Sequence, residues 1–135
     1  MRAMTEALRH RGADVAGVFT HQGVGLGHAR LSIIDLSRAG HQPMCAEGGA
    51  AVIAYNGEVY NFRELRRELE AQGAAFRSRT DTEVVLQGYL RWGDALFPRL
   101  NGMFALAIWD ARASRLVLAR DRFGIKPLYY HEGAG

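Results

Sequence analysis

Two amphipathic helices in the middle of the chain, each with its own start and stop signals, most constrain the fold. Asn61 and Glu64 have the spacing of a capping box before the first helix, and Thr80 and Glu83 repeat it before the second. A glycine follows each apolar pattern where a helix is expected to end. The expected apolar faces are Phe62, Leu65 and Leu69 in the first helix and Val85, Tyr89 and Trp92 in the second.

Strand patterns lie on both sides of this helical pair. Residues 14–34 predict two strands joined by a turn near His21–Gly23, and residues 50–61 predict a third. Beyond the helices, "MFALAIWD" and "RLVLARD" predict a hairpin that turns at Ala111–Ser114, and "GIKPLYY" predicts one more strand. The order of strands, helices and strands predicts an α+β fold with antiparallel sheets.

Two shorter helical segments are also expected. Residues 1–10 place Met1, Met4 and Leu8 on one helical face. "DALFPRL" adds at most a turn of helix, because Pro98 opposes a longer one.

Length, charge and cysteine content narrow the class of protein. The 135 residues suit a single domain, and 17 Lys and Arg against 14 Asp and Glu give a formal net charge of +3. The basic residues are scattered, which argues against nucleic-acid binding. No run approaches the ~20 apolar residues of a membrane span, and the one cysteine, Cys45, cannot form an internal disulfide. We therefore expect a cytoplasmic protein with neither a nucleic-acid nor a membrane partner.

Three features suggest ligand sites at first sight but lack the required context. "GVGLGH" has alternating glycines and continues as a strand, so it does not match the phosphate-binding loop that opens a helix. The five histidines show no metal-ligand spacing, so we expect no metal site. The sequence around Cys45 shows no residue positioned to act as a general base for the thiol, so we expect an ordinary loop cysteine there.

Other polar residues are open to two interpretations. Arg30 is either a surface arginine or a guanidinium aimed at a carboxylate. Asp81 lies in the first turn of a helix, where the dipole favours a negative charge. Glu58 follows Asn56-Gly57 inside an apolar strand, so it must face water, pair with a cation or bind a ligand. Asn56-Gly57 either forms a tight turn or provides hydrogen-bond donors for a ligand. The strand pattern that continues after it argues against a hairpin.

Taken together, six segments in this order resemble the glutaminase domain of glutamine-dependent asparagine synthetase. The resemblance runs from about Leu8 to Tyr130. The segments are "RHRGADVAGVF", "HARLSIIDLSRAGHQPM", "YNGEVYNFRELR", "SRTDTEVVLQGYLRWG", "LNGMFALAIWD" and "ARDRFGIKPLYY".

The resemblance implies a fold and an activity. The fold is a four-layer αββα sandwich of the N-terminal-nucleophile (Ntn) hydrolase type, and the activity is hydrolysis of L-glutamine to glutamate and ammonia. No cofactor is implied for this domain. A synthetase domain, C-terminal in the same chain, would use ATP and Mg²⁺ to amidate aspartate with that ammonia. A homodimer of the full-length protein is a further expectation.

The resemblance also implies a glutamine pocket. The residues that match its positions are Arg30, Ile33, Ile34, Asn56, Gly57, Glu58 and Asp81. Arg30 would bind the α-carboxylate of glutamine, and Glu58 and Asp81 would surround its α-ammonium group. Asn56 and Gly57 would form the oxyanion hole, with a side-chain amide and a backbone N–H as donors.

The family's nucleophile, a cysteine at the mature N-terminus, has no counterpart here, because Arg2 follows Met1. We therefore expect residues 1–135 to be a single partial domain that lacks its first strand and the synthetase domain and is inactive alone. A pseudo-enzyme is the alternative explanation for the missing cysteine. Two other functions stay open: a non-catalytic glutamine-binding module, and an amidotransferase domain that serves another acceptor carboxylate.

Overall fold

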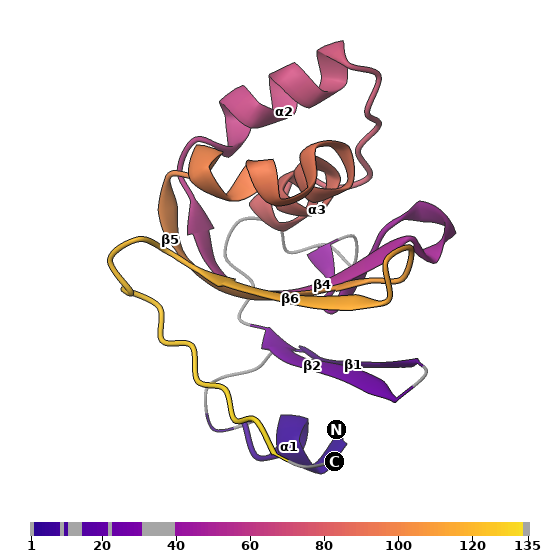
Figure 1. Ribbon diagram of the computed structural model, residues 1–135, viewed down its shortest axis with the longest axis vertical. Coiled ribbons are helices and arrows are strands. Elements are labelled where there is room, and N and C mark those ends of the chain that lie inside the picture. The colour runs from indigo at the N-terminus through magenta and orange to yellow at the C-terminus, as the bar shows by residue number, and fades with distance from the viewer. Residues whose placement is uncertain (1, 9, 11–14, 22, 31–39, 134–135) are drawn as a thin grey trace.

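The computed structural model describes residues 2–8, 10, 15–21, 23–30 and 40–133, and it arranges them in four layers (Figure 1). Helices α2 (Phe62–Ala71) and α3 (Asp81–Trp92) cover one face of a four-stranded sheet. The antiparallel pair β1 (Val15–His21) and β2 (Val24–Arg30) lies on the other side, followed by α1 (Arg2–Glu6). The predicted α+β fold with two antiparallel sheets is confirmed.

The four-stranded sheet has the order β3-β4-β5-β6, and all its pairs are antiparallel. Its strands are β3 (Met44–Cys45), β4 (Ala51–Val59), β5 (Gly102–Asp110) and β6 (Arg115–Arg120), and the short 3₁₀ helix η3 (Glu47–Gly49) joins the first two. β3 pairs only with Val52 and Ile53 of β4. Beyond Ile53, the outer edge of β4 has no strand partner among the described residues.

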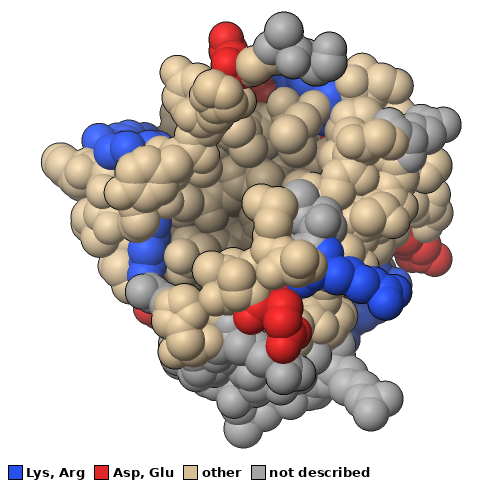
Figure 2. Space-filling model, turned by 90° about the horizontal axis from the view of Figure 1, so that it is seen from below, with Lys and Arg blue, Asp and Glu red and all other residues tan. Residues whose placement is uncertain are grey.

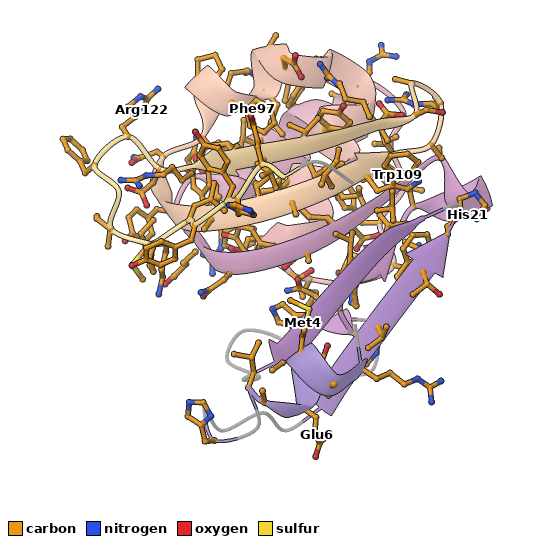
Figure 3. All side chains as sticks on the ribbon, turned by 60° about the horizontal axis from the view of Figure 1, so that its bottom comes forward. Met4, Glu6, His21, Phe97, Trp109 and Arg122 are labelled. Carbon is orange, nitrogen blue, oxygen red and sulfur yellow. The ribbon has the colours of Figure 1, made fainter. Side chains whose placement is uncertain are left out.

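Strand β4 divides the interior into two cores because its side chains alternate between faces. Tyr55 and Val59 belong to the larger core under α2 and α3. Val52 faces the opposite way and forms a smaller core with Leu26 and Trp109, between the two sheets. Figure 3 labels Trp109 at this junction. The residues of β4 that follow therefore also alternate between the helices and the β1–β2 layer.

Helix α3 forms as its sequence predicts. Thr80 Oγ1 accepts a hydrogen bond from the Glu83 N–H at 3.2 Å, and Gly93, with φ 58°, ends the helix. Val85 and Tyr89 are buried. A 3₁₀ helix, η4 (Gly93–Arg99), follows despite Pro98.

The predicted capping box of α3 is only half formed. The Glu83 carboxylate does not bond back to Thr80. Its two oxygens accept from the backbone N–H groups of Arg77, at 2.9 Å, and Ser78, at 2.6 Å. It thereby orders the loop before the helix.

The capping role predicted for Asn61 is wrong, although α2 begins and ends close to the predicted positions. The Asn61 side chain makes no bond to its own helix. Its Nδ2 donates to the Arg99 carbonyl at 3.0 Å, and its Oδ1 accepts from the Asn101 N–H at 2.9 Å. Both polar atoms of the Asn61 side chain therefore bond to a segment distant in sequence, because the connection between η4 and β5 passes beside the start of α2.

The helix at the N-terminal end departs from its predicted apolar face. Met4 and Leu8 are 65% and 45% exposed, whereas Thr5 is buried. Met1 lies outside the described residues. The face of α1 that carries Met4 is therefore exposed, although the sequence pattern predicted that it would be buried.

The strand predicted over residues 124–130 does not form. The Asp121 carboxylate accepts backbone N–H groups from Phe123, Ile125 and Lys126, so it bends the chain into a loop after β6. The segment then turns away from the sheet, as Figure 1 shows in yellow. Among the described residues, no helix has both the length and the apolarity needed to cross a membrane.

Candidate active site at the edge of β4

The outer edge of β4 gathers most of the predicted site residues. The Tyr55 N–H donates to Gln42 Oε1 at 2.7 Å, and the Val59 N–H donates to Asp81 Oδ2 at 3.0 Å. Both amides therefore point out of the sheet, away from β5. Since backbone groups of the same direction recur at every second residue, the Gly57 N–H points out of the same edge.

The partner of Gly57 on β5 supports this orientation. Gly57 lies opposite Phe104, whose N–H donates to Asp121 Oδ2 at 3.2 Å and whose carbonyl accepts from the Asp121 N–H at 2.8 Å. Phe104 thus directs both backbone groups away from β4. No hydrogen bond across the outer edge involves Gly57 among the described residues. Within the described part of the chain, its N–H is therefore a donor available to a ligand.

Glycine at position 57 is required by the spacing of the two strands. A Cβ there would lie 2.2 Å from the Met103 carbonyl oxygen and 2.6 Å from Phe104 Cα. Gly102 meets the same limit, because its Cβ would lie 2.1 Å from the Glu58 carbonyl oxygen. Backbone atoms cannot move aside as a flexible side chain can, so only glycine places its N–H here without displacing β5.

Asn56 and Glu58 flank Gly57 and project toward the side of β1–β2. Both follow the alternation of Val52, and both are exposed. Neither side chain makes a hydrogen bond or ion pair within the described part of the chain. A side-chain amide, a backbone N–H and a carboxylate are therefore available on three consecutive residues.

Asp81, the first residue of α3, contacts the same strand from the helix layer. Asp81 is only 4% exposed, and its Oδ2 accepts from the Tyr55 hydroxyl at 2.7 Å as well as from the Val59 N–H. Oδ1 accepts from the Thr82 N–H at 2.9 Å. Burial, followed by the Asp81 carboxylate, raises the pKa of Tyr55 well above its usual value, so the hydroxyl stays protonated and donates.

The other predicted residues are placed only in part. Glu58 and Asp81, predicted as a pair, approach β4 from different directions, and no bond joins them. Arg30 ends β2 opposite Val15, and its side chain lies outside the described part. His28, two residues earlier, holds β2 against β4, with Nε2 at 2.9 Å from the Tyr55 carbonyl oxygen.

The remaining pocket residues, Ile33 and Ile34, lie outside the described residues. Arg30 thus belongs to a strand that touches β4, and Asn56, Gly57, Glu58 and Asp81 lie on or against β4 itself. How these residues act on a ligand stays a prediction.

Cys45 does not have the surroundings of a nucleophile. It lies on β3 opposite Val52, outside the free part of the β4 edge. Burial of the thiol raises the pKa of Cys45, although the nearby Arg77 guanidinium opposes the shift. A reactive cysteine needs the opposite shift, toward the thiolate. The described residues also contain no group of three His, Cys, Asp or Glu that could bind a metal ion.

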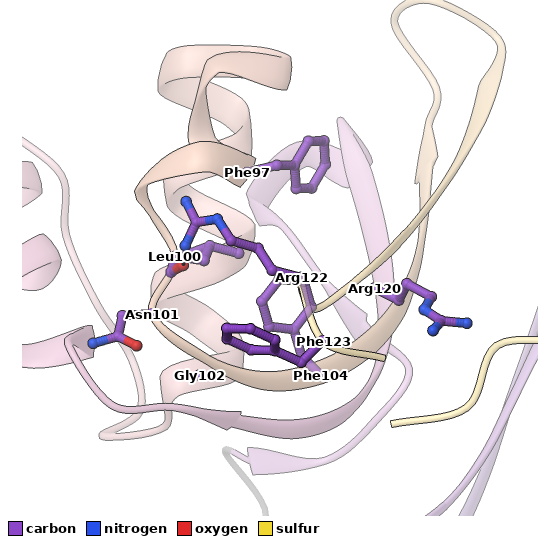
Figure 4. Close-up of a pocket in the computed structure, with 8 residues that line it drawn as sticks. All are labelled: Phe97, Leu100, Asn101, Gly102, Phe104, Arg120, Arg122 and Phe123. Atoms are coloured by element: carbon purple, nitrogen blue, oxygen red, sulfur yellow. Dashed lines mark hydrogen bonds between the residues drawn. The ribbon is translucent and has the colours of Figure 1, made fainter. Parts of the chain in front are cut away.

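The described surface includes a hollow and a pocket. Figure 2, viewed from the side of α1, shows a hollow near its centre that is lined mostly by uncharged side chains. A pocket with a volume of about 70 Å³ lies beside η4, β5 and β6, and Figure 4 shows its lining residues. In that pocket, the Arg122 guanidinium donates to the Leu100 carbonyl at 3.4 Å, so the cation is already engaged by the chain. Its lining residues are Phe97, Leu100, Asn101, Gly102, Phe104, Arg120, Arg122 and Phe123.

Comparison with known proteins shows the family of this chain. The sequence matches the glutamine amidotransferase domain family over residues 1–135. The chain belongs to this family. The domain is 43% identical to asparagine synthetase [glutamine-hydrolyzing] 3 of Bacillus subtilis, over 96% of this chain and 21% of that protein. It is 46% identical to asparagine synthetase [glutamine-hydrolyzing] 1 of the same organism, over 96% of this chain and 20% of that protein.

The domain thus spans about a fifth of the length of these relatives. A further relative is the amidase chry2 of Gibberella zeae, 41% identical over 93% of this chain and 19% of that protein.

Solved structures support the Ntn-hydrolase fold. The glutamine phosphoribosylpyrophosphate amidotransferase of B. subtilis matches with a TM-score of 0.59 and 25% identity, over 72% of this domain and 23% of that chain. A structure described as the allosteric regulatory enzyme of purine biosynthesis matches with a TM-score of 0.61 and 25% identity, over 76% and 24%. The fold class expected from the sequence is confirmed.

Sequence reasoning missed three residues that shape the site. Gln42, Tyr55 and His28 bond to the outer edge of β4 or belong to it, yet none carries a local signal of that role.

Proposed function

We propose that this domain binds L-glutamine and provides the oxyanion hole for its hydrolysis to glutamate and ammonia. The observation that carries the proposal is the outward-directed N–H of Gly57, free of partners among the described residues, next to the exposed amide of Asn56. Two donors on adjacent residues suit the oxygen that becomes negative as the amide carbonyl turns tetrahedral.

The ends of the substrate would be recognised by charge. The Arg30 guanidinium can bind the α-carboxylate through two parallel hydrogen bonds. Glu58, with no bonded partner in the described chain, can receive the α-ammonium group. Asp81 can contribute its negative charge, although its Oδ2 already accepts two hydrogen bonds from β4. The backbone at Ile33 and Ile34 would line the same pocket.

The chemistry also needs a thiolate, which Cys45 does not supply. Its pKa is raised, and β3 places it away from Gly57. We therefore expect the 135-residue polypeptide to release no ammonia from glutamine by itself. An ammonia-release assay that detects turnover in this polypeptide would contradict the expectation.

The ammonia is proposed to serve ATP- and Mg²⁺-dependent amidation of aspartate by a synthetase domain, as the names of the asparagine synthetase relatives suggest. A homodimeric full-length protein stays part of this proposal. A different acceptor is the second candidate, because the amidase relative is nearly as similar, at 41% identity. Product analysis with aspartate and other carboxylates would separate the two.

Asn56→Ala tests the oxyanion hole in the protein that carries this domain. Loss of one donor should lower kcat for glutamine hydrolysis by about 10²–10³, with a much smaller change in KM. Asn101→Ala is the matched control, since that exposed side chain makes no bond in the described structure, and it should keep activity. Cys45→Ser should keep it too. An Asn56→Ala enzyme with unchanged kcat would refute the assignment.

A further inference from the structure

Gln42 lies where three elements of the fold meet. Its side chain is buried, Oε1 accepts from the Tyr55 N–H of β4 at 2.7 Å, and Nε2 donates to Thr82 Oγ1 of α3 at 3.4 Å. Strand β1 packs on its backbone, because a Cβ at Gly17 would lie 2.0 Å from the Gln42 carbonyl oxygen. The Gln42 side chain thus joins β4 to α3, and its backbone lies against β1.

The Gln42 side chain also supplies the acceptor that a neighbouring strand would otherwise provide to the Tyr55 N–H. Met44 pairs with Ile53, so the register would bring residue 42 opposite Tyr55. Strand β3 begins only at Met44, however, so residue 42 does not continue the backbone ladder. The Gln42 amide then satisfies Tyr55, while Asp81 satisfies Val59 two positions beyond Gly57. The N–H groups on both sides of Gly57 along this edge are thus bonded, whereas the Gly57 N–H has no partner among the described residues.

We propose that Gln42 is a positioning residue of the oxyanion hole, which fixes the edge of β4 so that the Gly57 N–H points at the reacting oxygen. The inference rests on the proposed function and deepens it. Gln42 itself touches no substrate in this proposal. It acts through the Tyr55 amide, and Thr82 orients it by accepting from Nε2.

A positioning role differs from a purely structural one in its kinetic effect. Misplacement of an oxyanion donor weakens binding of the transition state far more than binding of glutamine, so kcat falls while KM changes little. A residue that only stabilised the fold would lower the amount of folded enzyme and leave kcat per folded molecule unchanged.

The test is Gln42→Met in the protein that carries this domain, with Gln72→Met as the matched control. Methionine keeps the size of the side chain but lacks the amide. Gln72 is an exposed glutamine at the end of α2, and its side chain bonds to Glu68 and Arg91. We expect Gln42→Met to lower kcat by about 10- to 100-fold with KM changed by less than about threefold, and Gln72→Met to change neither. Unchanged kcat in folded Gln42→Met overturns the proposal.

A milder pair of variants decides the question if Gln42→Met does not fold. Thr82→Val removes the acceptor of the Gln42 Nε2 proton, whereas Thr82→Ser keeps it. A lower kcat in Thr82→Val than in Thr82→Ser supports the positioning role, and equal kcat values overturn it.

Amide hydrogen exchange separates failure of this inference from failure of the proposed function. In the wild type, the Tyr55 amide should be protected and the Gly57 amide should exchange rapidly. Gln42→Met should speed exchange at Tyr55 by about tenfold or more, and Gln72→Met should not. An enzyme without glutaminase activity would refute the proposed function. Unchanged Tyr55 exchange in folded Gln42→Met, or in Thr82→Val relative to Thr82→Ser, would refute the anchoring of β4 by Gln42.

Discussion

Single residues in this domain act mainly through their backbone groups and through the neighbours that hold them. Gly57 offers an N–H because the outer edge of β4 has no strand partner there among the described residues, and it must be glycine because β5 lies so close. The side chains of Asn56 and Glu58 are available to a ligand because successive side chains of β4 point to opposite faces, and these two point away from the helix-side core. The chemistry of position 57 therefore depends on spacing as much as on residue type.

Gly57→Ala tests this spacing through stability. The added methyl group would meet backbone atoms of Met103 and Phe104, so we expect the free energy of unfolding to fall by about 1–3 kcal/mol. Gly133→Ala is the control, since its methyl group would meet only the His131 side chain at 3.3 Å. Urea denaturation of both variants measures the difference. Equal stability would show that β4 and β5 can separate without cost.

At the scale of elements, long-range bonds decide how helices attach to the sheet. Thr80 caps α3 as the local sequence predicts. Asn61 instead connects the start of α2 to the segment between η4 and β5, which is about forty residues away. A capping pattern identifies where a helix begins, but tertiary contacts decide which group satisfies the cap residue.

Asn61→Ser distinguishes a cap from this connection. Serine caps helices as well as asparagine does, so a true cap would tolerate the change. Because serine cannot reach both Arg99 and Asn101, we expect Asn61→Ser and Asn61→Ala to lose a similar 1–2 kcal/mol, roughly one for each hydrogen bond. Thermal unfolding of the two variants provides the measurement. Wild-type stability in Asn61→Ser would restore the capping interpretation.

For the whole molecule, two buried carboxylates at the ends of the β5–β6 hairpin link stability to pH. The Arg112 hydrogen bond holds the pKa of Asp110 at about 2, and backbone N–H groups, that of Lys126 first, hold the pKa of Asp121 at about 2. Unfolded aspartate titrates near 3.9, so the folded pKa values are depressed. Their contribution to stability is complete above about pH 5 and is lost as the pH falls toward 2.

The free energy of unfolding should therefore decline steadily between about pH 5 and 2. Asp110→Asn and Asp121→Asn should each reduce this dependence while lowering stability at pH 7, because neutral amides lose the charged hydrogen bonds. Asp94→Asn, at an exposed ion pair with Arg115, should leave most of the acid dependence in place. Urea titrations across this pH range provide the measurement. An unchanged slope in both buried-site variants would contradict the assignment.

The sequence by itself determined the helix that begins after Thr80, the two hairpins, the Asn56-Gly57-Glu58 motif and the family to which the domain belongs. These features rest on local pattern, in which neighbours along the chain are neighbours in space. Only the tertiary structure decided that the Gly57 N–H points out of an open edge, that Asp81 bonds to β4, and that Gln42 anchors Tyr55. The physical reason is that backbone direction in a strand is fixed by its partners, and these partners are brought there by the fold.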